Sequence, residues 1–307
     1  MIYESAVELI GQTPLFHARR FAGQMGVDAD IVVKLESRNP GGSAKDRIAF
    51  EMIEAAERRG ALKPGATLIE ATSGNTGVGL GVVAAVKGYH VILTMPDTMS
   101  IERIKILRAL GVEVVLTEGA RGMAGANEKA EEILQSTPGS MRMLQFENPD
   151  NPAAHEKTTG PEIWADTEGK LDALVAGVGT GGTLCGTGRF LKRKDPSVQV
   201  VAVQPEESPV LTGGKAGPHG IQGIGANFVP GNYEPSVVDL VISVPTSESI
   251  EAAKAFMRSE GVLCGISGGA ALLAAVRFAK QSKRAGQRVV VILPDTGERY
   301  LSTELFA

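Results

Sequence analysis

The sequence has 307 residues, of which 43% are hydrophobic and 21% are charged. This composition is typical of globular proteins and excludes a disordered chain. Its 31 basic and 35 acidic residues give a net charge of −4, so no overall positive field favours nucleic acid or an anionic membrane. The 2 cysteines predict a reducing, cytoplasmic location. The scattered histidines predict no metal site, and we expect neither a signal peptide nor a membrane-spanning segment.

Short apolar or β-branched runs alternate with helix-period segments along the chain. In chain order, the predicted strands are residues 31–36, 67–71, 90–95, 112–116, 142–146, 172–177, 198–204, 240–244 and 289–294. Residues 46–59 predict an amphipathic helix with one apolar face. Many of the strands are apolar at consecutive positions, which is typical of parallel strands covered by helices on both faces. The predicted fold class is therefore α/β, with two open, twisted, mostly parallel sheets.

The best place for a domain division is the segment "NPDNPAAHEK", residues 148–157. Its two prolines and its polar residues separate one series of strands and helices from the next. Ligands of open parallel sheets bind beyond the carboxyl ends of the strands. Two such sheets that face each other would hold a ligand between them.

Four segments join an apolar strand or an extended arm to the start of a helix through small residues. They are residues 39–50, 69–80, 176–186 and 263–273. Any one of them is explained equally well as a plain connector that needs glycine. Their occurrence together predicts that several turns converge on one site.

Two of these turns suit different anions. Residues 72–77, "TSGNTG", offer hydroxyl groups, a side-chain amide and backbone N–H groups before a helix, which favour a carboxylate. Residues 179–183, "GTGGT", allow the backbone to approach a phosphate closely, and Thr180 and Thr183 add hydroxyl donors. The sequence therefore predicts one carboxylate site and one phosphate site.

Gly177, Gly179 and Gly182 also satisfy the G-x-G-x-x-G spacing of a dinucleotide site. Such a site requires an acidic residue at the end of the next strand, where this sequence has Gln204. A nicotinamide-dependent oxidoreductase is thus a remote alternative. A phosphate, an amino-acid carboxylate and a reactive lysine favour pyridoxal phosphate instead, although Lys45 taken alone is explained as a solvated lysine at a helix start.

These turns belong to a longer set of motifs by which the sequence resembles the cysteine synthases, the A-type O-acetylserine sulfhydrylases of the fold-type II pyridoxal-phosphate family. The resemblance covers nearly the whole chain. The motifs are "IGQTPL" (10–15), "NPGGSAKDR" (39–47), "ATSGNTG" (71–77), "NPDNPAAHEKTTGPEIW" (148–164), "GVGTGGT" (177–183), "IQGIGANF" (221–228), "GISGGA" (265–270) and "LPDTGERYLST" (293–303). Cys185, Asn227 and Gly268 depart from the residues that are usual in the family.

The resemblance implies a tryptophan synthase β-like fold with the cofactor in the cleft between two α/β domains. The smaller, mobile, substrate-binding domain would comprise residues 1–12 and 38–148. The larger domain, which binds the cofactor phosphate, would comprise residues 13–37 and 149–307.

The resemblance also implies roles for individual residues. Lys45 would be the catalytic lysine that binds the cofactor's aldehyde, Asn75 would contact the ring hydroxyl, and Ser267 would contact the pyridine nitrogen. Taken alone, Ser267 is explained as a serine of a glycine-rich turn. The phosphate would bind Gly179, Thr180, Gly181, Gly182 and Thr183, and the substrate would bind Thr72, Ser73, Gly74, Thr76, Gln145 and Gly223.

The activity implied by the resemblance is that of a transferase. It would make L-cysteine and acetate from O-acetyl-L-serine and sulfide, by β-replacement through an aminoacrylate intermediate. An enzyme that uses O-phosphoserine or another thiol, as the cystathionine β-synthases do, is the alternative. The resemblance further implies a homodimer that binds the C-terminal tail of serine acetyltransferase.

Overall fold

The structure is a computed structural model that describes residues 2–282 and 284–307. The chain divides into two compact units. Unit 1 comprises Met1–Gly11 and Asn39–Asn151, and unit 2 comprises Gln12–Arg38 and Pro152–Ala307. The chain thus passes from one unit to the other after residues 11, 38 and 151, where the sequence analysis places limits after residues 12, 37 and 148.

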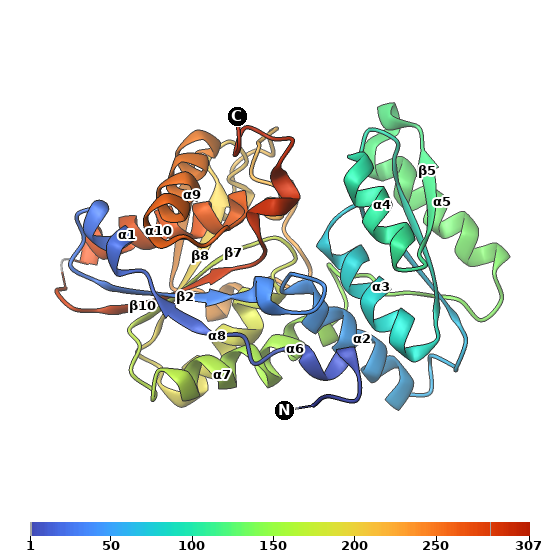
Figure 1. The fold of residues 1–307 in the computed structure, drawn as a ribbon, viewed down its shortest axis with the longest axis horizontal. Coiled ribbons are helices and arrows are strands. Elements are labelled where there is room, and N and C mark those ends of the chain that lie inside the picture. The colour runs from blue at the N-terminus through green and yellow to red at the C-terminus, as the bar shows by residue number, and fades with distance from the viewer. Residues whose placement is uncertain (1, 283) are drawn as a thin grey trace. The chain divides into compact units, whose positions relative to one another are not determined.

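Unit 2 contains a sheet with the strand order β1-β2-β10-β7-β8-β9 (Figure 1). The edge strand β1 runs antiparallel to β2, and the other neighbouring strands described in this sheet are parallel. Val32 and Val33 are buried on opposite faces, as are Val200 and Val201, which explains why these strands are apolar at consecutive positions. The strands are β1 (Leu15–His17), β2 (Asp30–Leu35), β7 (Ala173–Gly177), β8 (Gln199–Pro205), β9 (Leu240–Val244) and β10 (Arg288–Leu293).

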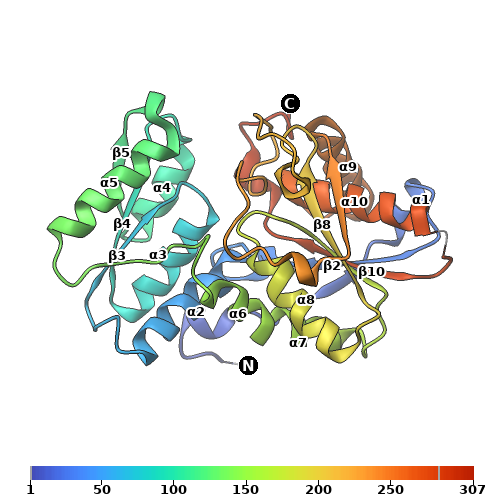
Figure 2. The same cartoon turned by 180° about the vertical axis from the view of Figure 1, so that it is seen from behind.

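Helices cover both faces of this sheet, as Figures 1 and 2 show. On one face, Phe21 of α1 and Phe256 of α9 meet edge to face with ring centroids 5.8 Å apart, and α10 packs beside them. On the other face, Ile163 of α7 and Leu191 of α8 enter a second apolar cluster. These helices are α1 (Arg19–Gln24), α7 (Thr159–Asp166), α8 (Gly182–Lys194), α9 (Thr246–Glu260) and α10 (Ile266–Ser282), whereas α6 (Asp150–Lys157) begins in unit 1 and continues into unit 2.

Unit 1 contains a parallel sheet with the strand order β5-β4-β3-β6. Ala126 and Ala130 of α5 pack against Ile69 and Ile92 on one face of it. The elements are α2 (Lys45–Arg58), β3 (Thr67–Ala71), α3 (Asn75–Lys87), β4 (His90–Pro96), α4 (Ile101–Ala109), β5 (Glu113–Thr117), α5 (Gly122–Ser136) and β6 (Met141–Arg142). Short 3-10 helices span Ala6–Leu9 and Gly119–Arg121 in this unit, and Glu36–Arg38, Val210–Thr212, Pro235–Val237 and Gly297–Tyr300 in unit 2.

The α/β class with two mostly parallel sheets is confirmed, and one predicted strand is wrong. The sequence predicts a strand over residues 142–146, but β6 ends at Arg142. Leu144 has a φ of 52°, in the left-handed region, so the chain turns where the apolar residues favoured an extended strand. The three-residue strand β1 is too short to give a sequence pattern and was not predicted.

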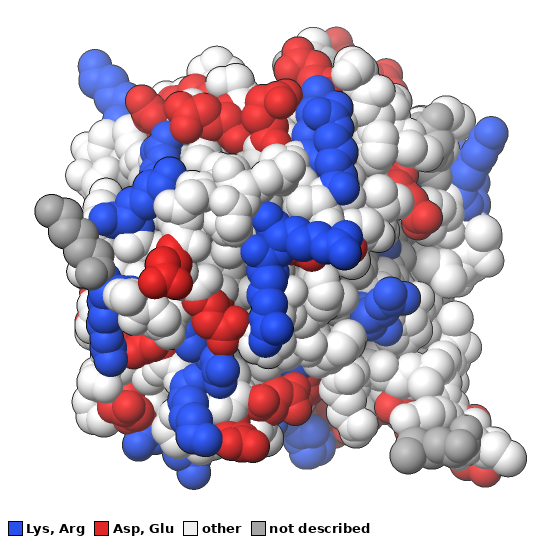
Figure 3. Space-filling model, turned by 60° about the vertical axis from the view of Figure 1, so that its left-hand side comes forward, with Lys and Arg blue, Asp and Glu red and all other residues white. Residues whose placement is uncertain are grey.

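Basic and acidic side chains are interspersed over the face of the molecule in Figure 3. Among the described residues, no helix has the length and hydrophobicity that crossing a membrane requires. Both cysteines are buried thiols, as expected for small apolar side chains. Burial raises the pKa of Cys185 to about 11 and also raises the pKa of Cys264.

Candidate active site

Lys45 is the first residue of α2 in unit 1, so its predicted place at a helix start is confirmed. The Lys45 N–H donates to Ser43 Oγ at 3.2 Å, and the Gly41 N–H donates to the buried carboxylate of Asp46. These bonds fix the backbone on both sides of Lys45. The positive end of the α2 dipole favours a neutral amine over an ammonium at this position.

The turn predicted to bind a carboxylate leads directly into α3. Gly74 precedes the helix without a side-chain cap, and its N–H donates to Thr72 Oγ1 at 3.2 Å. One helical turn after Asn75, a Cβ on Gly79 would lie only 2.8 Å from the carbonyl oxygen of Lys45. The missing side chain therefore allows α3 to pack against the first turn of α2, which brings the carboxylate turn close to Lys45.

Gln145 lies in the turn after β6 and is buried. The Thr76 hydroxyl donates to Gln145 Oε1 at 2.5 Å, and Asn151 Nδ2 donates to the Gln145 carbonyl oxygen at 2.6 Å. The structure thus brings Gln145 to the first turn of α3, beside the predicted carboxylate turn. Glu70 accepts the Gln145 N–H at 3.4 Å and was not predicted. An acidic residue inside an apolar strand is the sequence feature that could have indicated it.

The turn predicted to bind phosphate connects β7 to α8 in unit 2. Gly181 has a φ of 85°, and a Cβ there would lie 2.8 Å from the Tyr233 nitrogen. A Cβ on Gly179 would lie 2.3 Å from the Gly223 carbonyl oxygen. Both positions therefore require glycine. Because α8 begins at Gly182 without a side-chain cap, its first N–H groups and its dipole favour an anion at this turn.

His155 supports the same turn, although no role at the site was predicted for it. His155 is buried, and its Nε2 lies 3.1 Å from Thr183 Oγ1 while its Nδ1 lies 2.9 Å from Thr159 Oγ1. When Nε2 carries the proton, His155 donates to Thr183 and the Thr183 hydroxyl hydrogen can be donated to an anion. An anion at this turn would therefore select that tautomer.

Ser267 and Gly223, which are far apart in the sequence, lie close together in unit 2. Ser267 is the second residue of α10 and is buried. A Cβ on Gly223, whose φ is 96°, would lie 3.5 Å from Ser267 Oγ. Since Gly223 also approaches Gly179, the structure collects three of the predicted site residues at one place in this unit.

The residues present fit one phosphate and one carboxylate better than a dinucleotide. Two helix starts suited to anions, those of α3 and α8, follow the two predicted turns. Gln204 stands at the position where a dinucleotide site needs a carboxylate. Its side-chain amide is used in hydrogen bonds to other residues of unit 2. Its Nε2 donates to Thr212 Oγ1 and Ser243 Oγ at 3.0 Å each, and its Oε1 accepts the Leu211 N–H at 2.9 Å.

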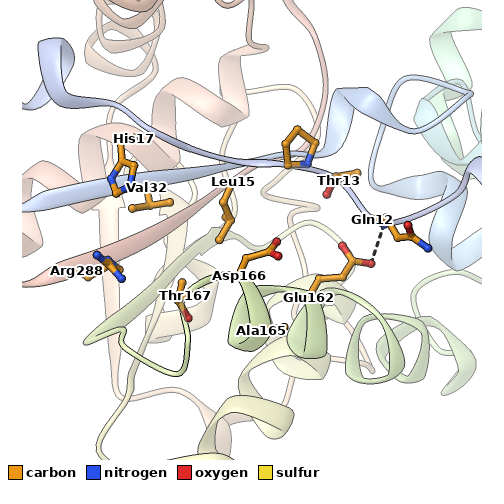
Figure 4. A pocket seen from close by; sticks show the side chains of 11 residues that line it. Gln12, Thr13, Leu15, His17, Val32, Glu162, Ala165, Asp166, Thr167 and Arg288 are labelled. Carbon is orange, nitrogen blue, oxygen red and sulfur yellow. Dashed lines mark hydrogen bonds between the residues drawn. The ribbon is translucent and has the colours of Figure 1, made fainter.

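A separate pocket of about 580 Å³ in unit 2 contains none of the predicted site residues. Figure 4 shows Leu15 of β1 above Glu162 and Asp166 of α7. The charged groups at this pocket pair with charges outside its lining: Glu162 and Asp166 lie 2.8 and 3.8 Å from the buried Lys34 Nζ, and His17 and Arg288 both contact Asp30. Nothing in this arrangement points to a ligand.

Comparison with known proteins agrees with this chemistry. Residues 7–295 match the family described as pyridoxal-phosphate dependent enzymes. Cysteine synthase A of Salmonella typhi is 51% identical, over 100% of this chain and 96% of that protein. The crystal structure of a cysteine synthase from Entamoeba histolytica has a TM-score of 0.97 at 45% identity, covering 100% of this chain and 91% of that chain. A hydrogen sulfide-producing enzyme from Fusobacterium nucleatum has a TM-score of 0.92 at 42% identity, covering 98% and 99%.

The chain therefore belongs to the family of pyridoxal-phosphate dependent enzymes. Its cofactor is pyridoxal phosphate, and the nicotinamide alternative is wrong. The similarity to cysteine synthases extends over both units, since it covers 100% of this chain.

Proposed function

We propose that this enzyme is a cysteine synthase, which converts O-acetyl-L-serine and sulfide to L-cysteine and acetate. The observation that carries the proposal is the 51% identity to a cysteine synthase over the whole chain. The anion-binding turns and Lys45 of this chain are the groups that such a reaction requires. When bound, pyridoxal phosphate supplies an aldehyde and an electron-withdrawing ring that ease removal of the α-proton and departure of acetate.

The substrate carboxylate binds at the start of α3 in this proposal. Thr72, Ser73 and Gly74 precede that helix, Thr76 lies in its first turn, and Gln145 is held beside it. The helix dipole and uncapped N–H groups favour a negative charge there. This binding orients the α-carbon of O-acetylserine relative to Lys45.

Lys45 moves the proton. Its neutral amine takes the proton from the α-carbon of O-acetylserine as acetate leaves from the β-carbon. After sulfide adds to the β-carbon, Lys45 returns a proton to the α-carbon. The first turn of α2 and the contact with Gly79 hold the lysine backbone in place for both transfers.

The proposal assigns each part of the cofactor to particular residues of this chain. We assign its phosphate to Gly179, Thr180, Gly181, Gly182 and Thr183, its pyridine nitrogen to Ser267, and its ring hydroxyl to Asn75. The glycine conformations at residues 179 and 181 and the buried hydroxyl of Ser267 support these assignments. Gly223, which lies against Ser267, is assigned to the substrate side.

The test of this proposal is replacement of the lysine. Lys45→Ala should lower turnover of O-acetylserine and sulfide by on the order of 10³-fold or more, because general acid–base catalysis and cofactor attachment are both lost. After borohydride reduction, mass spectrometry should find the cofactor on Lys45 in the wild type and on no residue in the variant. Lys63→Ala, at an exposed lysine of the same unit, is the matched control and should behave as the wild type.

Substrate identity needs a second measurement. Product analysis with O-acetylserine and with O-phosphoserine, each with sulfide, separates the proposed activity from its alternative. Faster turnover of O-phosphoserine would replace the proposal with that alternative. Recovery of the cofactor on a different lysine would overturn the assignment of Lys45 itself.

We also propose a homodimer in the cytoplasm that binds the C-terminal tail of serine acetyltransferase. The turn before α3 suits a peptide's terminal carboxylate as well as a substrate's. The two reduced, buried cysteines agree with a reducing compartment. Light scattering that gives twice the chain mass of 32.1 kDa would support the dimer, and a mass of one chain would contradict it.

A further inference from the structure

Glu70 is a buried acid inside the apolar strand β3. It is 3% exposed, and its neighbours Ile69 and Ala71 belong to the apolar cluster under α5. Because side chains alternate along a strand, Glu70 points to the opposite face of the sheet. A carboxylate is retained in such a place only when hydrogen bonds replace the water it has lost.

Both oxygens of Glu70 accept backbone N–H groups from the turn after β6. Oε2 accepts from Leu144 at 3.0 Å, and Oε1 accepts from Gln145 at 3.4 Å. Leu144 has a left-handed φ of 52° and is 42% exposed. A leucine disfavours this conformation, and its half-exposed side chain contributes little burial to hold it. The two bonds to Glu70 hold the N–H groups of this turn from the side of β3, while the Leu144 carbonyl oxygen accepts the N–H groups of Glu147 and Asn148.

The turn is the backbone from which Gln145 reaches the first turn of α3. The N–H of Gln145 is held by Glu70, its carbonyl oxygen by Asn151, and its side chain by Thr76. A shift of the Leu144–Gln145 peptide would move the Gln145 amide away from Thr76. The geometry thus connects a buried carboxylate in β3 to the predicted carboxylate site.

We propose that Glu70 is the positioning residue of the substrate carboxylate site, acting through the Leu144–Gln145 turn that it holds. This inference rests on the proposed function, since it takes Gln145 and Thr76 as substrate-binding residues. It assigns to Glu70 no contact with substrate.

The role requires a carboxylate and not merely a polar side chain. Two N–H donors need two acceptor oxygens, whereas a glutamine offers one oxygen and places an –NH₂ group against the other donor. Burial raises the pKa of Glu70, while the Leu144 N–H, the charge of Arg142 and the N–H groups of Gln145 and Met143 oppose that rise. Burial of Glu70 is therefore offset because both of its carboxylate oxygens accept hydrogen bonds.

The experiment compares Glu70→Gln with the wild-type holoenzyme. The concentration of O-acetylserine that gives half the maximal rate of its half-reaction should rise about tenfold, the loss expected for one hydrogen bond near charge. The limiting rate should change less than threefold, and the response to sulfide should not change. Hydrogen exchange at the Leu144 and Gln145 amides should become faster.

Thr94→Val is the matched control. Thr94 is a buried residue on the neighbouring strand β4, and its hydroxyl donates to the Ala126 carbonyl oxygen at 2.7 Å, away from the Leu144–Gln145 turn, while its backbone carbonyl, which accepts the Thr72 N–H, is kept in the variant. This variant removes one buried hydrogen bond from the same sheet but should leave the affinity for O-acetylserine unchanged. An equal loss of affinity in both variants would show that Glu70 serves stability alone.

A rescue variant separates positioning from folding. Glycine adopts a left-handed φ without penalty, so Leu144→Gly added to Glu70→Gln should recover at least half of the lost affinity. If the double variant does not recover the affinity for O-acetylserine, the inference is overturned. This holds even where Glu70→Gln alone folds poorly. A wild type that does not convert O-acetylserine would instead overturn the proposed function, and this inference with it.

Discussion

His155 of α6 contacts Thr183 in the predicted phosphate turn and Thr159 in α7, and its contribution to cofactor binding can be measured. His155→Phe removes the hydrogen bond at 3.1 Å that orients the Thr183 hydroxyl. One hydrogen bond contributes about 1–1.5 kcal/mol, so the dissociation constant of pyridoxal phosphate should rise about tenfold. Equilibrium dialysis of the reconstituted enzyme measures it.

The control for this prediction is Thr158→Val. Thr158 lies near His155 in the chain, but its hydroxyl donates to the Ala154 carbonyl oxygen at 2.7 Å and not to Thr183. Its loss should leave cofactor affinity unchanged. An unchanged affinity in His155→Phe would mean that Thr183 is oriented without the imidazole.

Single residues were predictable where a local pattern carries their chemistry. The glycines before the start of α8 predicted a phosphate site from the sequence alone, whereas the role expected of Lys45 came from the resemblance. His155 and Glu70 were missed because their partners lie 28 and 74 residues away. Only folding brings those partners together, and a buried histidine or acid in one sequence has no periodicity that reveals it.

Two glycines of α3, Gly79 and Gly81, pack against different parts of unit 1. Substituting each of them compares the packing of α3 beside Lys45 with its packing elsewhere. A Cβ on Gly79 would lie 2.8 Å from the Lys45 carbonyl oxygen, and a Cβ on Gly81 would lie 2.9 Å from Val112 Cγ2. Overpacking costs about 1–3 kcal/mol, partly offset by about 1 kcal/mol of helix propensity gained by alanine. Both alanine variants should therefore lose similar, modest amounts of stability in urea unfolding.

The two variants should differ in activity. Gly79→Ala pushes α3 against the backbone of Lys45 and should lower kcat at least tenfold, whereas Gly81→Ala meets a side chain that can move and should retain more than half of kcat. If both variants keep their kcat, the packing of α3 on α2 does not position Lys45.

Elements were predictable in proportion to the length of their pattern. Residues 46–59 predict a helix that is observed over Lys45–Arg58, because its apolar face repeats over several turns. The strand expected over residues 142–146 is wrong because a short apolar run does not show that Glu70 holds a turn there. The helix starts at Lys45 and Asn75 followed from the small residues before them.

The assignment of chain segments to the two units was the feature that local sequence predicted least. Gln12–Arg38 belongs to unit 2, where β2 pairs with β10 from the far end of the chain. Nothing in this short segment indicates which sheet it joins, since both sheets need apolar parallel strands. Only the resemblance to a known family supplied that assignment, whereas the alternation of strands and helices supplied the fold class.

Removal of the cofactor tests the residues that we propose to hold it. A ligand at 100 times its dissociation constant stabilises the folded state by about 2.7 kcal/mol, so treatment with hydroxylamine and dialysis should lower Tm by about 5 °C. In hydrogen exchange, the apoenzyme should lose protection at residues 179–183 of unit 2 and also at residues 45–48 and 75–77 of unit 1. Residues 19–24, which form α1 and carry no proposed contact, serve as the internal control. Adding pyridoxal phosphate back should restore all three segments together. A change confined to one unit would show that this unit alone binds the cofactor, and the assignments in the other would have to be withdrawn.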